Sequence, residues 1–136
     1  MVKEEISIEQ PKTRWAIAPD WFQENHRSIS VLVQNYLCPK CDKQLSAKGK
    51  KESPDALMSA INKCCSRAPD FINDRLPILE SIFRFFLTNG NQPLDIEELG
   101  KQLNTLRGGD PYRTSIETLS RLLKNDSFYG LKEIVE

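Results

Sequence analysis

Apolar residues recur at helical spacing along most of the chain and predict a mainly helical fold. The first such stretch begins at Pro19-Asp20, where a proline and a negative charge suit the first turn of a helix. Its apolar positions are Trp21, Phe22, Ile29, Leu32, Val33 and Tyr36. We expect one helix here that buries these side chains and ends just before Cys38.

A second helix is predicted after Ser53, with this serine as the N-cap and Pro54 at the first helical position. Its apolar stripe consists of Leu57, Ala60, Ile61 and Cys64. The preceding connection, residues 42–52, carries four lysines around Gly49 and predicts a solvated loop, with contacts to phosphates as the alternative. Residues 1–14 are polar and without pattern, which is typical of a tail.

The second half of the chain has a longer apolar helix. Pro77 opens it, and Gly90 suits the left-handed residue after its end. Its broad apolar face consists of Ile78, Leu79, Ile82, Phe83, Phe86 and Leu87. We expect this helix at the centre of the core.

Two shorter capped helices and one strand follow. Asp95 to Glu98 reads as a capping box, flanked by Leu94 and Leu99 as a hydrophobic staple, and this helix should end near Leu103. After a turn at 107–111, Thr114 to Glu117 reads as a second capping box before Leu119, Leu122 and Leu123. Residues 128–135 predict a turn and one short strand. The predicted organisation is a tail at 1–14, a helical lobe at 15–70 and a second lobe at 71–136.

Composition limits the classes of protein. The 136 residues, 39% hydrophobic and 28% charged, are typical of a soluble globular domain, and no apolar run approaches the roughly 20 residues that cross a bilayer. The net charge is zero, and residues 1–66 carry 10 basic and 8 acidic side chains against 9 and 11 in residues 67–136. Any nucleic-acid binding must therefore be local.

Four cysteines are the strongest chemical signal. Cys38-Pro-Lys-Cys41 is followed by the adjacent pair Cys64-Cys65, and four thiolates match the coordination of structural zinc. Adjacent side chains diverge by about 100° in a helix, so both late cysteines reach one ion only where a helix ends. Pro69 lies shortly after them and favours such an end. We therefore predict a zinc site formed by Cys38, Cys41, Cys64 and Cys65.

Three alternatives stay open for these thiols. His26 could replace one cysteine, but twelve residues of continuous helix would place it about 18 Å from Cys38. Cys38 and Cys41 could form a redox pair, although no strand precedes them in the pattern. Disulfides are the third, but residues 1–10 lack the apolar core of a secretory signal, so a reducing cytoplasm is expected.

The order of elements in residues 76–136 resembles the winged-helix form of the helix-turn-helix family: a long apolar helix, a capped short helix, a turn, another short helix and an extended tail. This resemblance implies that the third helix, residues 115–124, contacts nucleic acid. By position, the residues that it carries over are Arg113, Thr114, Ser115, Thr118, Arg121 and Lys124. A full wing needs two strands, and the sequence after Leu123 has room for one. The loop after Arg107 is also longer than the roughly three or four residues of a tight helix-turn-helix.

Cys38-Pro-Lys-Cys41 is also similar to half of a zinc-ribbon knuckle, with Asp42 in place of the usual glycine.

An enzyme is not expected, because the chain has one histidine, no phosphate-binding glycine loop and no recognisable nucleophile, and four thiolates would leave zinc no open position. Two functions remain. A nucleic-acid-binding regulator predicts an exposed face with Arg113, Arg121 and Lys124, whereas a protein-interaction adaptor predicts an exposed apolar patch that includes Phe128, Tyr129 and Trp15.

Overall fold

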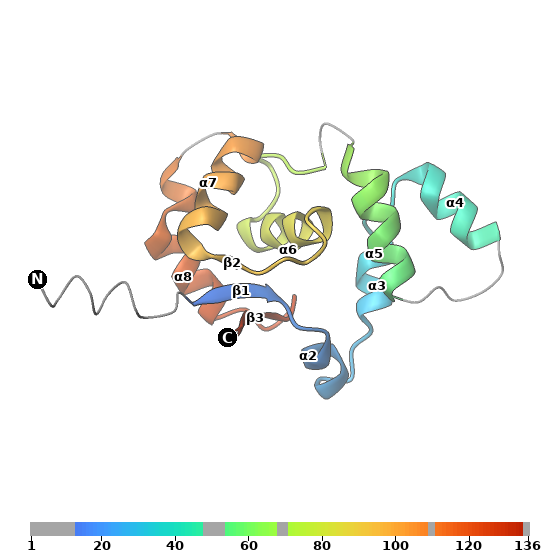
Figure 1. Cartoon of the computed structure of the whole chain (residues 1–136), viewed down its shortest axis with the longest axis horizontal. Coiled ribbons are helices and arrows are strands. Elements are labelled where there is room, and N and C mark those ends of the chain that lie inside the picture. The colour runs from blue at the N-terminus through green and yellow to red at the C-terminus, as the bar shows by residue number, and fades with distance from the viewer. Residues whose placement is uncertain (1–12, 48–53, 68–70, 109–110, 135–136) are drawn as a thin grey trace, which may run out of the picture.

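The structure of the chain is a computed structural model that describes residues 13–47, 54–67, 71–108 and 111–134. Within these residues the fold is mainly helical, with a small three-stranded sheet (Figure 1). The α-helices are α2 (Pro19–Glu24), α3 (Ile29–Gln34), α4 (Pro39–Ala47), α5 (Pro54–Lys63), α6 (Ile78–Thr88), α7 (Ile96–Arg107) and α8 (Ile116–Lys124). Short 3-10 turns lie at η1 (Cys65–Arg67) and η2 (Pro111–Thr114), and the strands are β1 (Arg14–Ile17), β2 (Leu94–Asp95) and β3 (Leu131–Ile134).

The strand nearest the start of the chain lies in the middle of the sheet. The order is β2-β1-β3, and both pairings are antiparallel. Trp15 faces Leu94 on one side and Glu133 on the other. The predicted tail ended at Arg14, which is instead the first residue of β1, and residues 1–12 lie outside the described part of the chain. Because Trp15, Ala16 and Ile17 are all buried, the strand shows no alternation of apolar and polar residues that could have revealed it.

The single helix predicted from Pro19 to Tyr36 is wrong: it is two helices, α2 and α3. His26 has a left-handed backbone with φ 56°, and the Arg27 amide donates to the Phe22 carbonyl at 2.8 Å. This is the bonding of a Schellman helix end, with histidine where glycine is usual. The Ser28 hydroxyl then accepts from the Val31 amide and caps α3.

The loop predicted at 42–52 is also corrected in its first part, because α4 continues to Ala47. Cys38 immediately precedes this helix, Pro39 is its first residue and Asp42 places a negative charge in its first turn. Residues 48–53, with three of the four lysines, and the predicted Ser53 cap lie outside the described residues. The start of α5 at Pro54 is as predicted.

Helix α6 is the central core helix, as expected. Ile82, Phe83, Phe86 and Leu87 are fully buried. Gly90 has φ +73°, and the amide after it, that of Asn91, donates to the Phe86 carbonyl at 2.7 Å. In Figure 1, α6 lies between α3, α4 and α5 at one end of the molecule and α7 and α8 at the other.

Helix α7 begins at the predicted cap, where the Asp95 carboxylate accepts from the Glu98 amide, but it runs to Arg107 and not to Leu103. The guanidinium of Arg107 is buried and donates to the Leu76 carbonyl at 2.7 Å and to the Ser81 hydroxyl at 2.6 Å. These tertiary contacts explain the extra turn, which local sequence does not encode. Helix α8 is capped by Ser115, one residue after the predicted Thr114.

Candidate metal centre and basic surface

Cys38-Pro-Lys-Cys41 forms the beginning of α4. Cys38 lies just before the helix and Cys41 lies within its first turn, so both sulfurs are at the same helix end. Cys41 is buried at 6% exposure, whereas Cys38 is partly exposed. A helix N-terminus carries unpaired amides and a positive partial charge, both of which favour thiolates.

The second pair comes from the end of α5. The helix stops at Lys63, Cys64 follows in a turn, and Cys65 opens η1. The predicted condition for adjacent cysteines to face one site, a helix end, is therefore met. Cys65 is buried at 2% exposure, and Cys64 is partly exposed.

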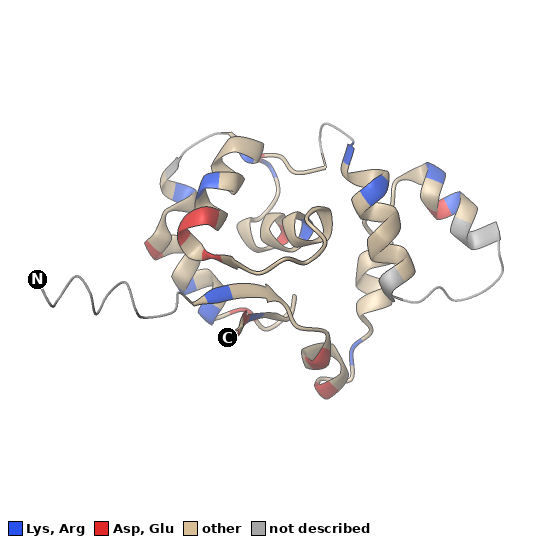
Figure 2. Ribbon diagram, viewed as in Figure 1, with Lys and Arg blue, Asp and Glu red and all other residues tan. Residues whose placement is uncertain are grey.

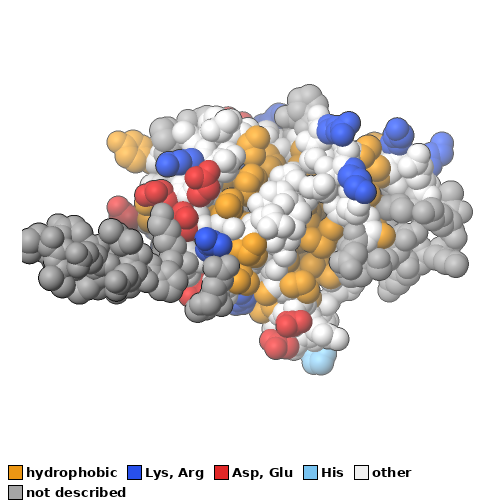
Figure 3. Space-filling view, in the orientation of Figure 1, with side chains coloured by type: hydrophobic (Ala, Val, Ile, Leu, Met, Phe, Trp, Pro, Cys, Tyr) orange, Lys and Arg blue, Asp and Glu red, His pale blue; other side chains and the backbone are white. Residues whose placement is uncertain are grey.

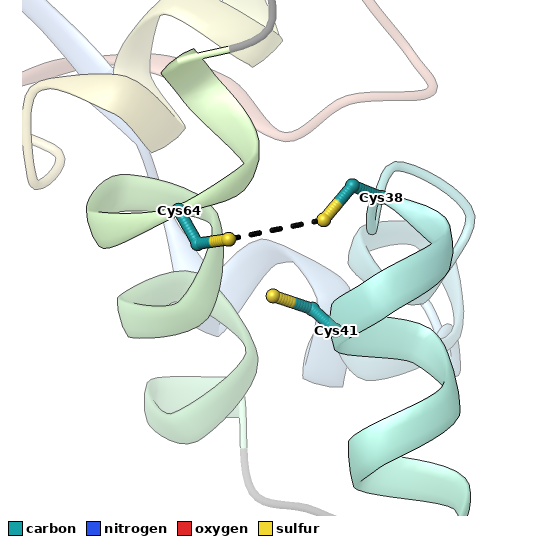
Figure 4. A group of neighbouring side chains, drawn as sticks. All are labelled: Cys38, Cys41 and Cys64. Atoms are coloured by element: carbon teal, nitrogen blue, oxygen red, sulfur yellow. Dashed lines mark hydrogen bonds between the residues drawn. The ribbon is translucent and has the colours of Figure 1, made fainter.

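The thiols of the two pairs meet between α4 and α5. The Sγ atoms of Cys38, Cys41 and Cys64 all lie within 4.8 Å of one another, and those of Cys38 and Cys64 are 3.9 Å apart (Figure 4). Sulfurs that share one zinc ion at about 2.3 Å are about 3.8 Å apart in a tetrahedron. The geometry is thus that of a group that could hold a metal ion.

Cys65 joins this group through Cys38. The Cys38 backbone amide donates to the Cys65 sulfur at 3.1 Å, and the Cys65 thiol lies within hydrogen-bonding reach of the Cys38 and Cys41 thiols. Amides that donate to sulfur stabilise the thiolate form that a metal requires. All four cysteines are free of disulfides.

The surroundings of Cys38, Cys41 and Cys65 shift the pKa values of these thiols in different directions. The hydrogen bond from the Cys41 amide, with further bonds from the neighbouring thiols, lowers the pKa of Cys38 to about 7. Burial raises the pKa of Cys41 and of Cys65. Without metal, the cluster therefore combines one thiol of lowered pKa with two buried thiols of raised pKa, and a cation would favour the thiolate at each ligand.

The alternatives for the cysteines find no support in the described residues. His26 is exposed at the left-handed end of α2 and is not among the side chains that converge on the thiols. The element before Cys38 is α3, and around the pair the described chain lacks the strand, helix and strand arrangement of a thiol-exchange site.

A second cluster of interest lies at α8. Arg113, Thr118 and Arg121 line one hollow of about 370 Å³ together with Ile78, Tyr112 and Leu122. Tyr112 is 82% exposed and was not predicted as a site residue. Its position in the turn between Pro111 and the α8 cap is the one feature of the sequence that could have indicated its exposure. The structure therefore brings three of the six residues carried over by resemblance to one depression.

The other three residues are placed differently. Thr114 is buried, and the Ser115 hydroxyl accepts from the Thr118 amide as the cap of α8. Lys124 is exposed and lines a separate hollow of about 330 Å³ with Trp15 and Lys132.

Charge is unevenly spread over the surface despite the net charge of zero. Basic residues mark α5 and acidic residues mark α2, whereas α4 carries both kinds (Figure 2). Figure 3 shows lysine and arginine side chains gathered over the end formed by α4 and α5, with an apolar band across the middle of the same face.

No helix in the described residues is long and apolar enough to span a membrane. The chain matches no protein-family model, no curated protein and no solved structure, so its site stands on geometry alone.

Proposed function

We propose that this chain binds nucleic acid through the face of η2 and α8, and that zinc held by Cys38, Cys41, Cys64 and Cys65 stabilises its N-terminal helices. The observation that carries the first part is the hollow where Arg113, Thr118 and Arg121 meet the exposed ring of Tyr112. The cysteine cluster supports the second part.

Zinc fits the donor set better than a hard cation does, because thiolates are soft ligands. With four thiolates the coordination shell would be closed, and the role would be structural and not catalytic. Bound zinc would join the start of α4 to the end of α5. Since α5 packs on α3 and on α6, the clasp would also fix α4 to the body of the molecule.

The η2 and α8 face has the chemistry to hold a phosphate backbone. Two guanidiniums can each make bidentate bonds to phosphate, the Thr118 hydroxyl adds a polar contact, and an exposed tyrosine can stack on a base or sugar. In the described residues neither Arg113 nor Arg121 has a carboxylate partner, so both charges are available to a ligand.

The arrangement of α6, β2, α7, α8 and β3 supports the winged-helix likeness as part of this proposal. That likeness lacked a second strand for the wing. In the structure β3 has an antiparallel neighbour, β1, which comes from the other end of the chain. We infer that β1 takes the place of the missing strand.

Salt-dependent binding tests the proposal. A fluorescently labelled DNA duplex should bind with an affinity that falls as salt rises, because each phosphate contact contributes about −0.9 to the slope of log K against log salt. The double variant R113A/R121A should reduce the magnitude of that slope by about 2. The control K43A/K63A removes two exposed charges from α4 and α5 and should leave the slope unchanged. Equal binding by R113A/R121A and the wild type would refute the proposal.

An adaptor that binds protein is the second candidate, and Phe128 favours it with 43% exposure. The predicted patch is wrong in one member, because Trp15 is buried in β1 at 4% exposure, and Tyr129 is half-buried. Absence of any salt-dependent binding to DNA or RNA would favour this candidate.

A further inference from the structure

A pocket of about 300 Å³ lies between the α2–α3 junction and the turn before β3. It is lined by Phe22, Arg27, Ser28, Val31, Leu32, Asn35 and Phe128. We call it the Arg27 pocket. It shares no lining residue with the hollow at η2 and α8 or with the cysteine cluster, and it shares Phe128 with the apolar patch of the adaptor candidate.

The Arg27 pocket is lined by four apolar side chains, and its polar members are Arg27, Ser28 and Asn35. Val31 and Phe128 are 54% and 43% exposed, so both offer apolar surface to a ligand from solvent. Small-molecule sites are commonly apolar hollows with a few placed polar groups, and this volume is at the lower end of their range of roughly 300–1,000 Å³. The pocket suits one ring or one branched alkyl group.

Arg27 gives the pocket its charge. Its guanidinium lies 4.2 Å from the ring centroid of Phe128 and 5.9 Å from that of Trp21. Both distances are within the range of cation–π contacts, and a guanidinium also offers N–H donors in a fixed fork that can bond a carboxylate. In the described residues Arg27 has no carboxylate partner, although Asp20 and Glu24 are exposed on the neighbouring helix α2.

Backbone bonds hold both sides of the pocket in place. On one side, the Arg27 amide is bonded to the Phe22 carbonyl and Ser28 caps α3. On the other side, the buried Asp126 carboxylate accepts from the amides of Phe128 at 3.1 Å, Tyr129 at 3.0 Å and Leu131 at 3.0 Å. A site with fixed walls and a fixed charge loses little entropy when a ligand binds.

Gly130 ties the two sides together. It has φ +65°, and a Cβ at this position would lie 2.6 Å from Cε2 of Phe22, which forms part of the pocket. Only glycine therefore allows the turn to approach Phe22 this closely. The glycine at this position therefore fixes the close contact between the turn before β3 and Phe22.

We propose that the Arg27 pocket binds a small organic acid that carries one aromatic or branched aliphatic group. The carboxylate forms a bidentate pair with Arg27, and the apolar group lies against Val31 and Phe128. The Ser28 hydroxyl, whose oxygen caps α3, can still donate its O–H, and the side-chain amide of Asn35 can bond a second polar group of the ligand. This inference does not depend on nucleic-acid or metal binding.

Phenylacetate is a suitable probe, and its binding to ¹⁵N-labelled full-length protein can be followed by NMR. We expect millimolar affinity, as is usual for ligands of this size, and shifts that concentrate at the amides of Val31, Leu32 and Phe128. Benzylamine has the same ring and the opposite charge, and 2-phenylethanol has no charge. Benzylamine should not bind, and 2-phenylethanol should bind about tenfold more weakly than phenylacetate.

Two variants and a control complete the test. Arg27→Gln should weaken phenylacetate binding about tenfold and leave that of 2-phenylethanol unchanged. Val31→Glu changes an exposed lining position, should leave the fold intact and should weaken phenylacetate binding by placing a like charge beside the carboxylate. Lys43→Gln, on α4, should match the wild type. Equal binding of phenylacetate and benzylamine, unchanged binding in R27Q, or no shift at about 20 mM phenylacetate would overturn the proposal.

Discussion

The two halves of the molecule are held together by different forces. From α6 onward, the chain buries a continuous set of large side chains, and α7 and α8 begin at the side-chain caps Asp95 and Ser115, as α3 in the other half begins at Ser28. The half from α2 to α5 consists of short helices, and between α4 and α5 the contact that stands out is a cluster of sulfurs. Small helical units commonly need a metal or another crosslink beside their apolar core, and the cysteine cluster lies where such a crosslink would join α4 to α5.

The largest expected effect is the removal of metal. Chelation of zinc from the purified protein should unfold α4 and its packing on α5 while α6 to α8 stay folded, because structural zinc contributes an apparent 10–16 kcal/mol in zinc-finger peptides. Loss of amide protection in residues 38–47, measured by hydrogen exchange, would show this. Cys→Ser changes at Cys41 and Cys65 should have the same effect. Unchanged protection and a metal-free protein as purified would contradict the clasp.

Phe83→Ala tests the other half. This side chain is fully buried in α6, where it contacts the rings of Tyr36 and Tyr129, and removing it should cost about 3–5 kcal/mol of unfolding free energy. The loss, measured by denaturant unfolding, should be the same with and without chelator. A loss that disappears when metal is removed would show that the two halves do not differ in the way proposed.

The pH dependence of the metal-free protein sharpens the comparison further. The unfolded thiol pKa is about 8.5 and that of folded Cys38 is about 7, so stability should rise between these values as the folded state loses a proton that the unfolded state keeps. Above about 8.5 it should fall, because the raised pKa of Cys41 and Cys65 makes the folded state retain protons that the unfolded state releases. Unfolding curves at about pH 7, 8.5 and 9.5 measure both trends. Cys38→Ser should abolish the rise in stability between these two pKa values and leave the fall at higher pH unchanged.

Ser115→Ala should have the smallest effect. Its hydroxyl accepts from the Thr118 amide at 3.3 Å, and loss of an N-cap costs about 1 kcal/mol. The change in the denaturant midpoint measures this loss. Because the side chain serves the cap, DNA binding by this variant at a temperature where it is folded should equal that of the wild type. Selective loss of binding would show that Ser115 contacts the ligand directly.

Local signals in the sequence predicted the second half best. Pro77, Gly90 and Asp95 each determine the start or end of a helix within one turn of their own position. For this reason α6 and the start of α7 could be predicted from neighbouring residues. The convergence of the four cysteines could be predicted because their spacing and the chemistry of thiolates allow few other arrangements.

The sequence predictions that proved wrong concern segments whose structure depends on tertiary contacts or is marked only by weak local signals. Strand β1 is paired on both sides by segments about 80 and 115 residues away, and no local pattern encodes such pairing. The extra turn of α7 depends on contacts of Arg107 with the segment before α6. The break between α2 and α3 at Asn25-His26 could have been predicted in part from the sequence. Both residues tolerate the left-handed region, and Ser28 is a strong N-cap.

The central position of β1 has a consequence for synthesis. Residues 14–17 are made more than 110 residues before their partner β3, so the β1–β3 pair cannot form until residues 131–134 have been made. Until then Trp15, Ala16 and Ile17 lack the contacts that bury them in the finished fold. Pairing across nearly the whole chain also raises the contact order and slows folding. A ribosome that stalls before Leu131 would therefore leave the β3 side of β1 as an open sheet edge.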